Sequence, residues 1–415
     1  MKRLLLIAYY FPPCGGAAVQ RWLRLLPILV KAGFDVTVIT TQDGDYILQD
    51  ESLLQKIPDE VHVFRTFTPT INKFWKMISS NKASLPYGSL STNKSMSLPK
   101  RLLYWLRLNL IIPDLRVIWN PFAKKKAIQL FNENNYDWVI TSGPPHSTHL
   151  IGLYLKNRYH VKWLADFRDP WTEIIYLKIE KQNRLIKSLN KRLEEKVVRN
   201  ADINLVVSKS IAQQLPDGNK VVFYNGFDFD QFQSIKYNNS GKFRIKYIGQ
   251  ITEGQDIYSL IEFIAKHTQE NDINDIEFII VGTKNLKPMS YTIPIKHIDY
   301  QPHDKALAEM VNCEILILMI NKYPNNQGML TTRLFEYIAA RTPVLCFGPL
   351  DGEAASIIND SNAGFVSENL NEDVWNYIYK GYTNWKKNVN QRNIHDVSKW
   401  SVQKQSGSLI DILNQ

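Results

Sequence analysis

Residues 4–18 read Leu-Leu-Leu-Ile-Ala-Tyr-Tyr-Phe-Pro-Pro-Cys-Gly-Gly-Ala-Ala, an apolar run that passes through a proline- and glycine-rich loop into a helix-compatible stretch. The run 4–10 is typical of a buried parallel strand. Amphipathic spacing then predicts a helix over about 17–32, which Pro27 should kink and Gly33 should end. Strand, loop and helix in this order form the repeating unit of a doubly wound α/β sheet.

The same alternation continues along the chain. In the first half we expect strands at 4–10, 36–40, 61–65, 138–141, 163–166 and 203–207. In the second half we expect strands at 245–249, 278–282, 315–319 and 343–347, and helices at 257–266, 304–311, 332–340 and 353–358. A polar, turn-rich stretch at 225–241 separates the halves.

We therefore predict an α/β protein with two Rossmann-like doubly wound parallel-sheet domains that face each other across a cleft. The predicted ranges are 1–225 for the first domain and 226–395 for the second. The remaining stretch, 396–415, is expected to form a helix that packs back on the first domain. A length of 415 residues fits two domains.

The positive charge of the chain is concentrated in one segment. The chain carries 50 Lys and Arg against 40 Asp and Glu, a net charge of +10. Residues Asn72–Lys126 alone contain eleven basic side chains and one acid, Asp114, so the rest of the chain sums to zero. This distribution argues against a nucleic-acid-binding face along the whole protein. It leaves one basic segment to be explained.

Cysteine content and hydropathy indicate the compartment. The three cysteines, Cys14, Cys313 and Cys346, have no metal-ligand spacing and exclude a disulfide framework, which favours a reducing cytoplasm. The N-terminal apolar run is short and lacks a cleavage pattern, so we interpret it as a strand and not as a signal peptide. No apolar run has the length of a spanning helix.

Four loops at expected strand ends carry polar side chains. In the first, Gly15 and Gly16 either let a phosphate approach a helix start or form an ordinary turn. In the second, after the strand at 138–141, His146 is either a catalytic candidate or a structural histidine, and His149 is the weaker candidate.

The third loop holds Asp166, Arg168 and Asp169 before a Pro-Trp pair. These residues either contact a ligand or form an internal ion pair. In the fourth, Thr332 suits a helix start, and an arginine in that first turn, Arg333, is better explained by an anionic ligand. Glu336 either accepts hydroxyls of a ribose or pairs with Arg333 on the surface.

These motifs together resemble the retaining glycosyltransferases of family 4, which have the GT-B fold, and specifically the bacterial capsule and O-antigen branch. The resemblance covers nearly the whole chain. Its motifs are Tyr-Phe-Pro-Pro at 10–13 with the two glycines, Ser-Gly-Pro-Pro-His-Ser at 142–147, Ala-Asp-Phe-Arg-Asp-Pro-Trp at 165–171, Asn-Gly-Phe-Asp at 225–228, and Leu-Phe-Glu-Tyr at 334–337 leading to Pro343-Val344.

The resemblance implies roles for individual residues. Gly15 and Gly16 would face the donor diphosphate or the acceptor, and His146 would lie beside the transferred sugar. Thr332 and Arg333 would contact the diphosphate, and Glu336 would hold the ribose. The nucleotide site would also include Gly249, Gly282 and Thr283, whereas Asp166 and Asp169 are candidates for the acceptor side.

Two departures from the family pattern concern the leaving group. The family usually has a glutamate eight residues before Glu336, where this chain has Gly328. It also commonly has an arginine and a lysine at the places of Gln250 and Gln255. Arg333, Arg168 and the amides of the glycine loop are then the candidates to neutralise the leaving phosphate.

The sequence therefore predicts a cytoplasmic glycosyltransferase that moves a sugar from a UDP- or GDP-linked donor to a glycan or lipid-linked glycan acceptor in bacterial surface polysaccharide biosynthesis. We expect no cofactor, no metal and no nucleic-acid partner, and the oligomeric state stays open. Segment 72–126 is expected to dock on the anionic inner face of the membrane. The alternatives are a sugar-nucleotide-binding subunit with little catalysis and a nucleotide-sugar epimerase of the same fold.

Overall fold

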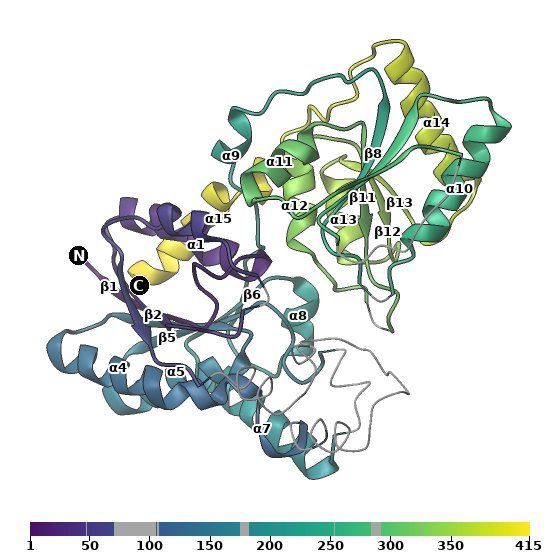
Figure 1. Cartoon of the computed structure of the whole chain (residues 1–415). Helices are drawn as coiled ribbons and strands as arrows, with labels where there is room; N and C mark the ends of the chain where they lie inside the picture. The colour runs from purple at the N-terminus through teal and green to yellow at the C-terminus, as the bar shows by residue number, and fades with distance from the viewer. Residues whose placement is uncertain are drawn as a thin grey trace, which may run out of the picture. The chain divides into compact units, whose positions relative to one another are not determined.

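The computed structural model describes residues 1–46, 48–69, 105, 108–174, 182–252, 254–283, 292–324 and 326–415. It divides into two compact units (Figure 1). Unit 1 comprises Met1–Tyr224 and Ser406–Gln415, and unit 2 comprises Asn225–Gln405. Most of the basic segment, including 72–104, lies outside the described residues.

Unit 1 is built on a parallel sheet of seven strands in the order β3-β2-β1-β4-β5-β6-β7. The strands are β1 (Arg3–Ala8), β2 (Asp35–Thr41), β3 (His62–Thr66), β4 (Trp138–Gly143), β5 (Lys162–Phe167), β6 (Ile203–Val206) and β7 (Lys220–Val222). Leu4 of β1 pairs with Val36 on one side and with Trp138 on the other. The order therefore reverses between β1 and β4, where doubly wound sheets bind their ligands.

Helices cover both faces of this sheet. They are α1 (Ala17–Lys31), α4 (Asn120–Glu133), α5 (His149–Tyr159), α7 (Arg184–Asn200), α8 (Lys209–Gln214) and α15 (Val402–Asn414), with short 3₁₀ turns η1 (Glu51–Lys56), η2 (Leu115–Trp119) and η3 (His146–Thr148). Figure 1 shows α1 and α15 on one face and α4 and α5 on the other. The end of α15 is attached to unit 1 because the Leu413 carbonyl accepts hydrogen bonds from Lys2 and Trp138, both at 3.1 Å.

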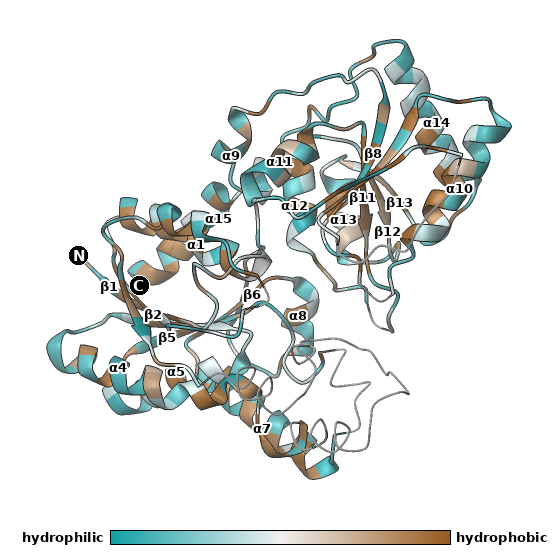
Figure 2. Ribbon diagram, in the orientation of Figure 1, coloured by the Kyte–Doolittle hydropathy of each residue, from teal (hydrophilic) through white to brown (hydrophobic). Residues whose placement is uncertain are grey.

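Unit 2 repeats the architecture with six parallel strands in the order β10-β9-β8-β11-β12-β13. The strands are β8 (Phe243–Ile248), β9 (Ile276–Val281), β10 (Ile295–Ile298), β11 (Ile315–Met319), β12 (Val344–Phe347) and β13 (Gly364–Ser367). The helices are α9 (Asp230–Gln233), α10 (Ile257–Glu270), α11 (His303–Val311), α12 (Thr332–Ala339), α13 (Glu353–Asp360) and α14 (Glu372–Lys386), followed by η4 (Ser398–Trp400). Figure 2 shows the hydrophobic residues concentrated in the strands and on the sheet-facing sides of the helices.

The structure confirms the predicted fold class of two parallel α/β sheets. Gly33 ends α1 as expected, with a positive φ of 86° and its N–H donating to the Val30 carbonyl at 2.9 Å. The burial of α1 extends beyond the apolar face that was predicted. Its polar residues Arg21 and Arg24 are also buried. Arg21 is buried because it belongs to the polar network at the end of β5.

Candidate functional site

The glycine loop of unit 1 follows β1 and starts α1. Gly15 packs against Leu48, and a Cβ at Gly15 would lie 3.1 Å from that side chain. Gly16 is exposed, has a φ of 86° and precedes a helix that has no side-chain cap and no acid in its first turn. This loop therefore presents uncapped backbone amides beside an open surface, which suits an anion.

Asp166, at the end of β5, is the centre of a buried network. It accepts hydrogen bonds from Arg21 Nε at 3.0 Å, from Trp22 Nε1 at 2.8 Å and from Ser142 Oγ at 3.0 Å. Arg21 Nη2 lies 2.9 Å from Asp166 Oδ1 as an ion pair. The side chains of Arg21 and Asp166 are 2% and 0% exposed. The expectation that Asp166 lies on the acceptor side is corrected, because its carboxylate faces the interior and is held by three donors.

Arg21 extends the same network toward the end of unit 1. Its Nη1 donates to the carbonyl of Phe223 at 2.9 Å and to that of Tyr224 at 3.3 Å. Its guanidinium also lies over the Phe223 ring, 4.8 Å from the centroid. One buried arginine thus joins α1, β5 and the last residues before unit 2.

Arg168 supports the neighbouring loop. Its Nε donates to the Gly143 carbonyl at 3.1 Å, and its Nη2 donates to the Pro144 carbonyl at 2.7 Å. Asp169, the next residue, is exposed. Within this motif the structure therefore distinguishes the buried carboxylate of Asp166 from the loop-supporting cation of Arg168.

His146 lies in η3, directly after the loop that Arg168 supports. It is buried, its ring stacks on Trp171 with centroids 5.2 Å apart, and both ring nitrogens lack a hydrogen-bond partner of good geometry. Burial lowers the pKa of His146 to about 3, which outweighs the opposite effect of the Pro170 backbone. His146 is therefore neutral near pH 7 and suits hydrogen bonding to a ligand better than proton transfer.

Two hydrogen bonds from Ser147 to the carboxylate of Asp114 fix the turn that carries His146. Asp114 accepts from the Ser147 backbone N–H and from its hydroxyl, both at 2.8 Å. His149, the weaker candidate, has its Nδ1 2.9 Å from Thr141 Oγ1 and packs 4.5 Å from the Phe167 ring. His149 therefore belongs to the core below the turn. Asp114, which entered the sequence prediction only through its charge, supports the turn that carries His146.

The nucleotide-site candidates of unit 2 lie where β8 and β9 end. Gly249 and Gly282 are adjacent, and the Thr283 hydroxyl donates to the Gly249 carbonyl at 2.6 Å. The Gln250 side-chain amide donates to the Gly282 carbonyl. The structure thus brings Gly249, Gly282 and Thr283 into one cluster, and Gln250 ties the two strand ends together.

Arg333 reaches the same cluster from the first turn of α12. Its Nη1 donates to the Ile248 carbonyl at 2.6 Å, and its guanidinium lies 5.2 Å from the centroid of Tyr247. A Cβ at Gly249 would lie 2.8 Å from Nη1, and Gly249 has a φ of 124°, so only glycine fits there. Thr332 starts α12, whose N-terminus has no side-chain cap.

Glu336, one turn further along α12, has a buried partner from α11. Its Oε1 lies 3.0 Å from Nε2 of His303, and the two side chains are largely buried. His303 was not among the site residues predicted from the sequence. The sequence carried only a weak indication of a role for His303, because a histidine at the first position of a short helix is common. The structure therefore adds a histidine that orients the carboxylate expected to hold the ribose.

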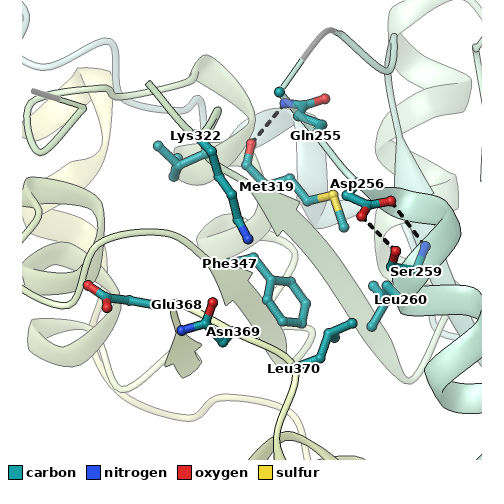
Figure 3. A pocket seen from close by; sticks show the side chains of 12 residues that line it. Gln255, Asp256, Ser259, Leu260, Met319, Lys322, Phe347, Glu368, Asn369 and Leu370 are labelled. Atoms are coloured by element: carbon teal, nitrogen blue, oxygen red, sulfur yellow. Dashed lines mark hydrogen bonds between the residues drawn. The ribbon is translucent and has the colours of Figure 1, made fainter. Parts of the chain in front are cut away.

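Gln255 connects the loop after β8 to the end of β11. Its Nε2 donates to the Met319 carbonyl at 2.9 Å and to Asn321 Oδ1 at 2.8 Å, and its Oε1 accepts from the Tyr247 hydroxyl at 2.8 Å. Beside it lies a cavity of about 60 Å³, lined among others by Met319, Lys322 and Phe347 (Figure 3). This cavity has room for a few water molecules.

No cluster of three or more metal-ligating side chains is present among the described residues. Two Asp-x-Asp triplets occur in the chain, at 43–45 and 228–230. Asp45 forms an ion pair with Arg116 at 2.8 Å, and Asp228 accepts from the Asp230 backbone N–H at 3.1 Å. These contacts give both triplets a structural use.

Comparison with known proteins identifies the fold. Residues 90–231, about a third of the chain, match the model of the family described as Glycosyltransferase Family 4. Alr3699/HepE of Anabaena in complex with UDP matches with a TM-score of 0.60, 15% identity and full coverage of both chains. The chain has the GT-B fold.

Further solved structures agree. TarM matches with a TM-score of 0.61 and 12% identity over 100% of this chain and 99% of its own. An α-glucosyltransferase in complex with UDP-glucose and DNA matches with a TM-score of 0.57 and 14% identity over both full chains. The search of curated proteins gave no match. The family match and the fold together support a glycosyltransferase.

Proposed function

We propose that this protein transfers a sugar from a UDP-sugar to a hydroxyl of a glycan or lipid-linked glycan acceptor, with retention of anomeric configuration, in bacterial surface polysaccharide assembly. The observation that carries the proposal is the cluster at the ends of β8 and β9, where Gly249, Thr283 and Arg333 meet the uncapped start of α12. The HepE structure named above holds UDP, and a second structure of HepE holds UDP-glucose, which supports a uridine nucleotide.

The proposed reaction breaks the bond between the anomeric carbon and the diphosphate oxygen and forms a bond to the acceptor oxygen. The acceptor proton leaves with the diphosphate or to solvent, so that the products are the glycoside and UDP. Negative charge grows on the leaving phosphate, and fixed dipoles and cations stabilise it most effectively. Arg333 and the amides of the first turn of α12 are the proposed stabilising groups.

Neutral His146 is proposed to hydrogen-bond the transferred sugar. With a pKa of about 3 it does not take the acceptor proton near neutral pH. Glu336, oriented by His303, is proposed to accept the hydroxyls of the ribose. In this proposal the amides of Gln250 and Gln255 are structural, because both side chains join strand ends of unit 2.

The proposed site of action is the inner face of the cytoplasmic membrane. No helix of the described residues is long and apolar enough to span a bilayer. Two side chains of segment 72–126, Arg116 and Trp119, are buried and are not part of the proposed membrane contact. Arg116 pairs with Asp45, and Trp119 is fully buried. Lys124 and Lys126 each lie 4.0 Å from an aromatic ring, over Tyr154 and Phe64.

The test is release of UDP from a panel of UDP-sugars in the presence of a bacterial membrane extract, with GDP-sugars as the comparison. Transfer of label into an extractable glycan or lipid supports the proposal, and the anomeric configuration of the product decides retention. UDP binding without release would favour a sugar-nucleotide-binding subunit. Interconversion of the free UDP-sugars would favour an epimerase.

A further inference from the structure

The outer face of α7 combines exposed leucines with cations. Leu185 and Leu189 are 72% and 45% exposed, and they lie one helical turn apart on the same face of the helix. Single exposed leucines are common on soluble proteins, but aligned ones indicate a surface that is covered in use. Figure 2 shows hydrophobic and hydrophilic bands alternating along this helix.

The spacing places four of these side chains in one stripe. Leu185, Leu189, Arg192 and Lys196 follow one another at intervals of four, three and four residues, which keeps them on one side of an α-helix. All four are exposed. The opposite side packs on unit 1 through buried residues that include Val197 and Val198.

The acids of α7 do not neutralise this stripe. Glu194 is buried and accepts hydrogen bonds from the Thr172 backbone N–H at 3.2 Å and from its hydroxyl at 2.5 Å. Glu195 lies off the stripe. Further exposed cations occur along the helix at Arg184, Lys187, Lys191 and Arg199. The exposed side of α7 is therefore both apolar and strongly positive.

The start of α7 is attached to other exposed apolar residues. The Asn183 backbone N–H donates to Asn109 Oδ1 at 2.7 Å, and Asn109 Nδ2 donates to the Trp105 carbonyl at 2.9 Å. Trp105 and Leu110 are 48% and 68% exposed. Tryptophan and leucine beside cations match the chemistry of a lipid headgroup boundary.

We propose that α7, together with Trp105 and Leu110, is the surface by which unit 1 binds an anionic lipid bilayer. The leucines enter the headgroup boundary, and Arg192 and Lys196 contact anionic headgroups. A second copy of this chain is a poorer partner, since the stripe carries cations and no acid to pair with them. The inference rests on the membrane docking proposed above and names a different surface for it.

The test measures binding of the full chain to sedimented vesicles, either phosphatidylcholine alone or equal parts of phosphatidylcholine and phosphatidylglycerol. Each cation at an anionic surface strengthens partitioning about fivefold, so R192Q/K196Q should weaken binding to anionic vesicles by more than about tenfold. The variant L185S/L189S should weaken binding by at least about tenfold. The matched control, L350S/I394S, changes two exposed apolar residues of unit 2 and should bind as the unchanged chain does.

Thermal unfolding of each variant checks that the fold is intact. No binding of the unchanged chain to anionic vesicles, or equal binding by L185S/L189S, would overturn the inference. Loss of self-association in that variant without any vesicle binding would identify a second copy as the partner and overturn it too. Hydrolysis of the UDP-sugar, in which water replaces the acceptor, is measured in parallel by the UDP released. This assay distinguishes a failure of the donor chemistry from a failure of membrane binding.

Discussion

Replacement of Asp166 by asparagine tests the buried network of unit 1. The carboxylate accepts from Arg21, Trp22 and Ser142, and the Arg21–Asp166 pair is almost completely buried. An asparagine of the same shape must direct its NH₂ group toward one of these donors, and it leaves the Arg21 charge without a counter-ion. Breaking a buried pair by removing one partner costs about 3–5 kcal/mol, so D166N should lower the free energy of unfolding of unit 1 by that amount.

Urea unfolding followed by tryptophan fluorescence measures this loss, and Trp22 lies directly on the network. The matched control is D35N, because Asp35 forms a partly exposed ion pair with Arg3 at 3.2 Å. An exposed pair contributes about 0–1 kcal/mol, so D35N should be nearly neutral. If D166N costs less than about 1 kcal/mol, the interpretation of Asp166 as a buried structural residue is wrong.

Four further changes test single residues. H146F should leave the shape of the pH–activity profile near neutrality unchanged. The pKa of His146 in the folded chain, about 3, lies below the ordinary 6.5, so its contribution to stability should be full above about pH 6.5 and be lost as the pH falls toward 3. Acid unfolding of H146F and of the unchanged chain measures this loss. H303L should raise the donor KM more than it lowers kcat, and H303Q, which keeps a donor for Glu336, should restore it; equal kinetics in all three would contradict the orienting role. R333A should lower kcat for the best donor more than UDP affinity measured by calorimetry, whereas a loss of affinity alone would remove the transition-state role. Q255L should destabilise unit 2 in urea by roughly 1–3 kcal/mol, and a neutral effect would show that its buried hydrogen bonds are replaceable.

Much of the fold could be predicted because its elements are local patterns. The central strands β1 and β11 are apolar on both sides, as strands between two helix layers must be, and they stand out in the sequence. The prediction missed β7, β10 and β13, which have three, four and four residues and lie at the edges of their sheets. So short a stretch carries too little periodicity to be distinguished from a loop.

The loops of the candidate site could be located because they follow strands that the sequence pattern predicts. The hydrogen-bond and ion-pair partners of the side chains in these loops could not be predicted. The sequence left open whether Asp166 contacts a ligand or forms an ion pair within its own loop, and its partner is Arg21, 145 residues earlier in the chain. Likewise, His303 reaches Glu336 from a different helix. Such contacts depend on how helices pack over the sheet, and a single sequence carries no signal for them.

In the proposed function, the strand-end cluster of unit 2 holds a UDP-sugar for transfer. UDP release from the UDP-sugar panel with membrane extract, compared between the unchanged chain and G249A, tests this role. Because a Cβ at Gly249 would lie 2.8 Å from Arg333 Nη1, the substitution must displace the guanidinium. We expect acceptor-dependent UDP release from the unchanged chain and at least a tenfold lower rate, about 1.4 kcal/mol, from G249A with its fold intact. Absence of release from every UDP-sugar, or equal release by the two proteins, would contradict this role.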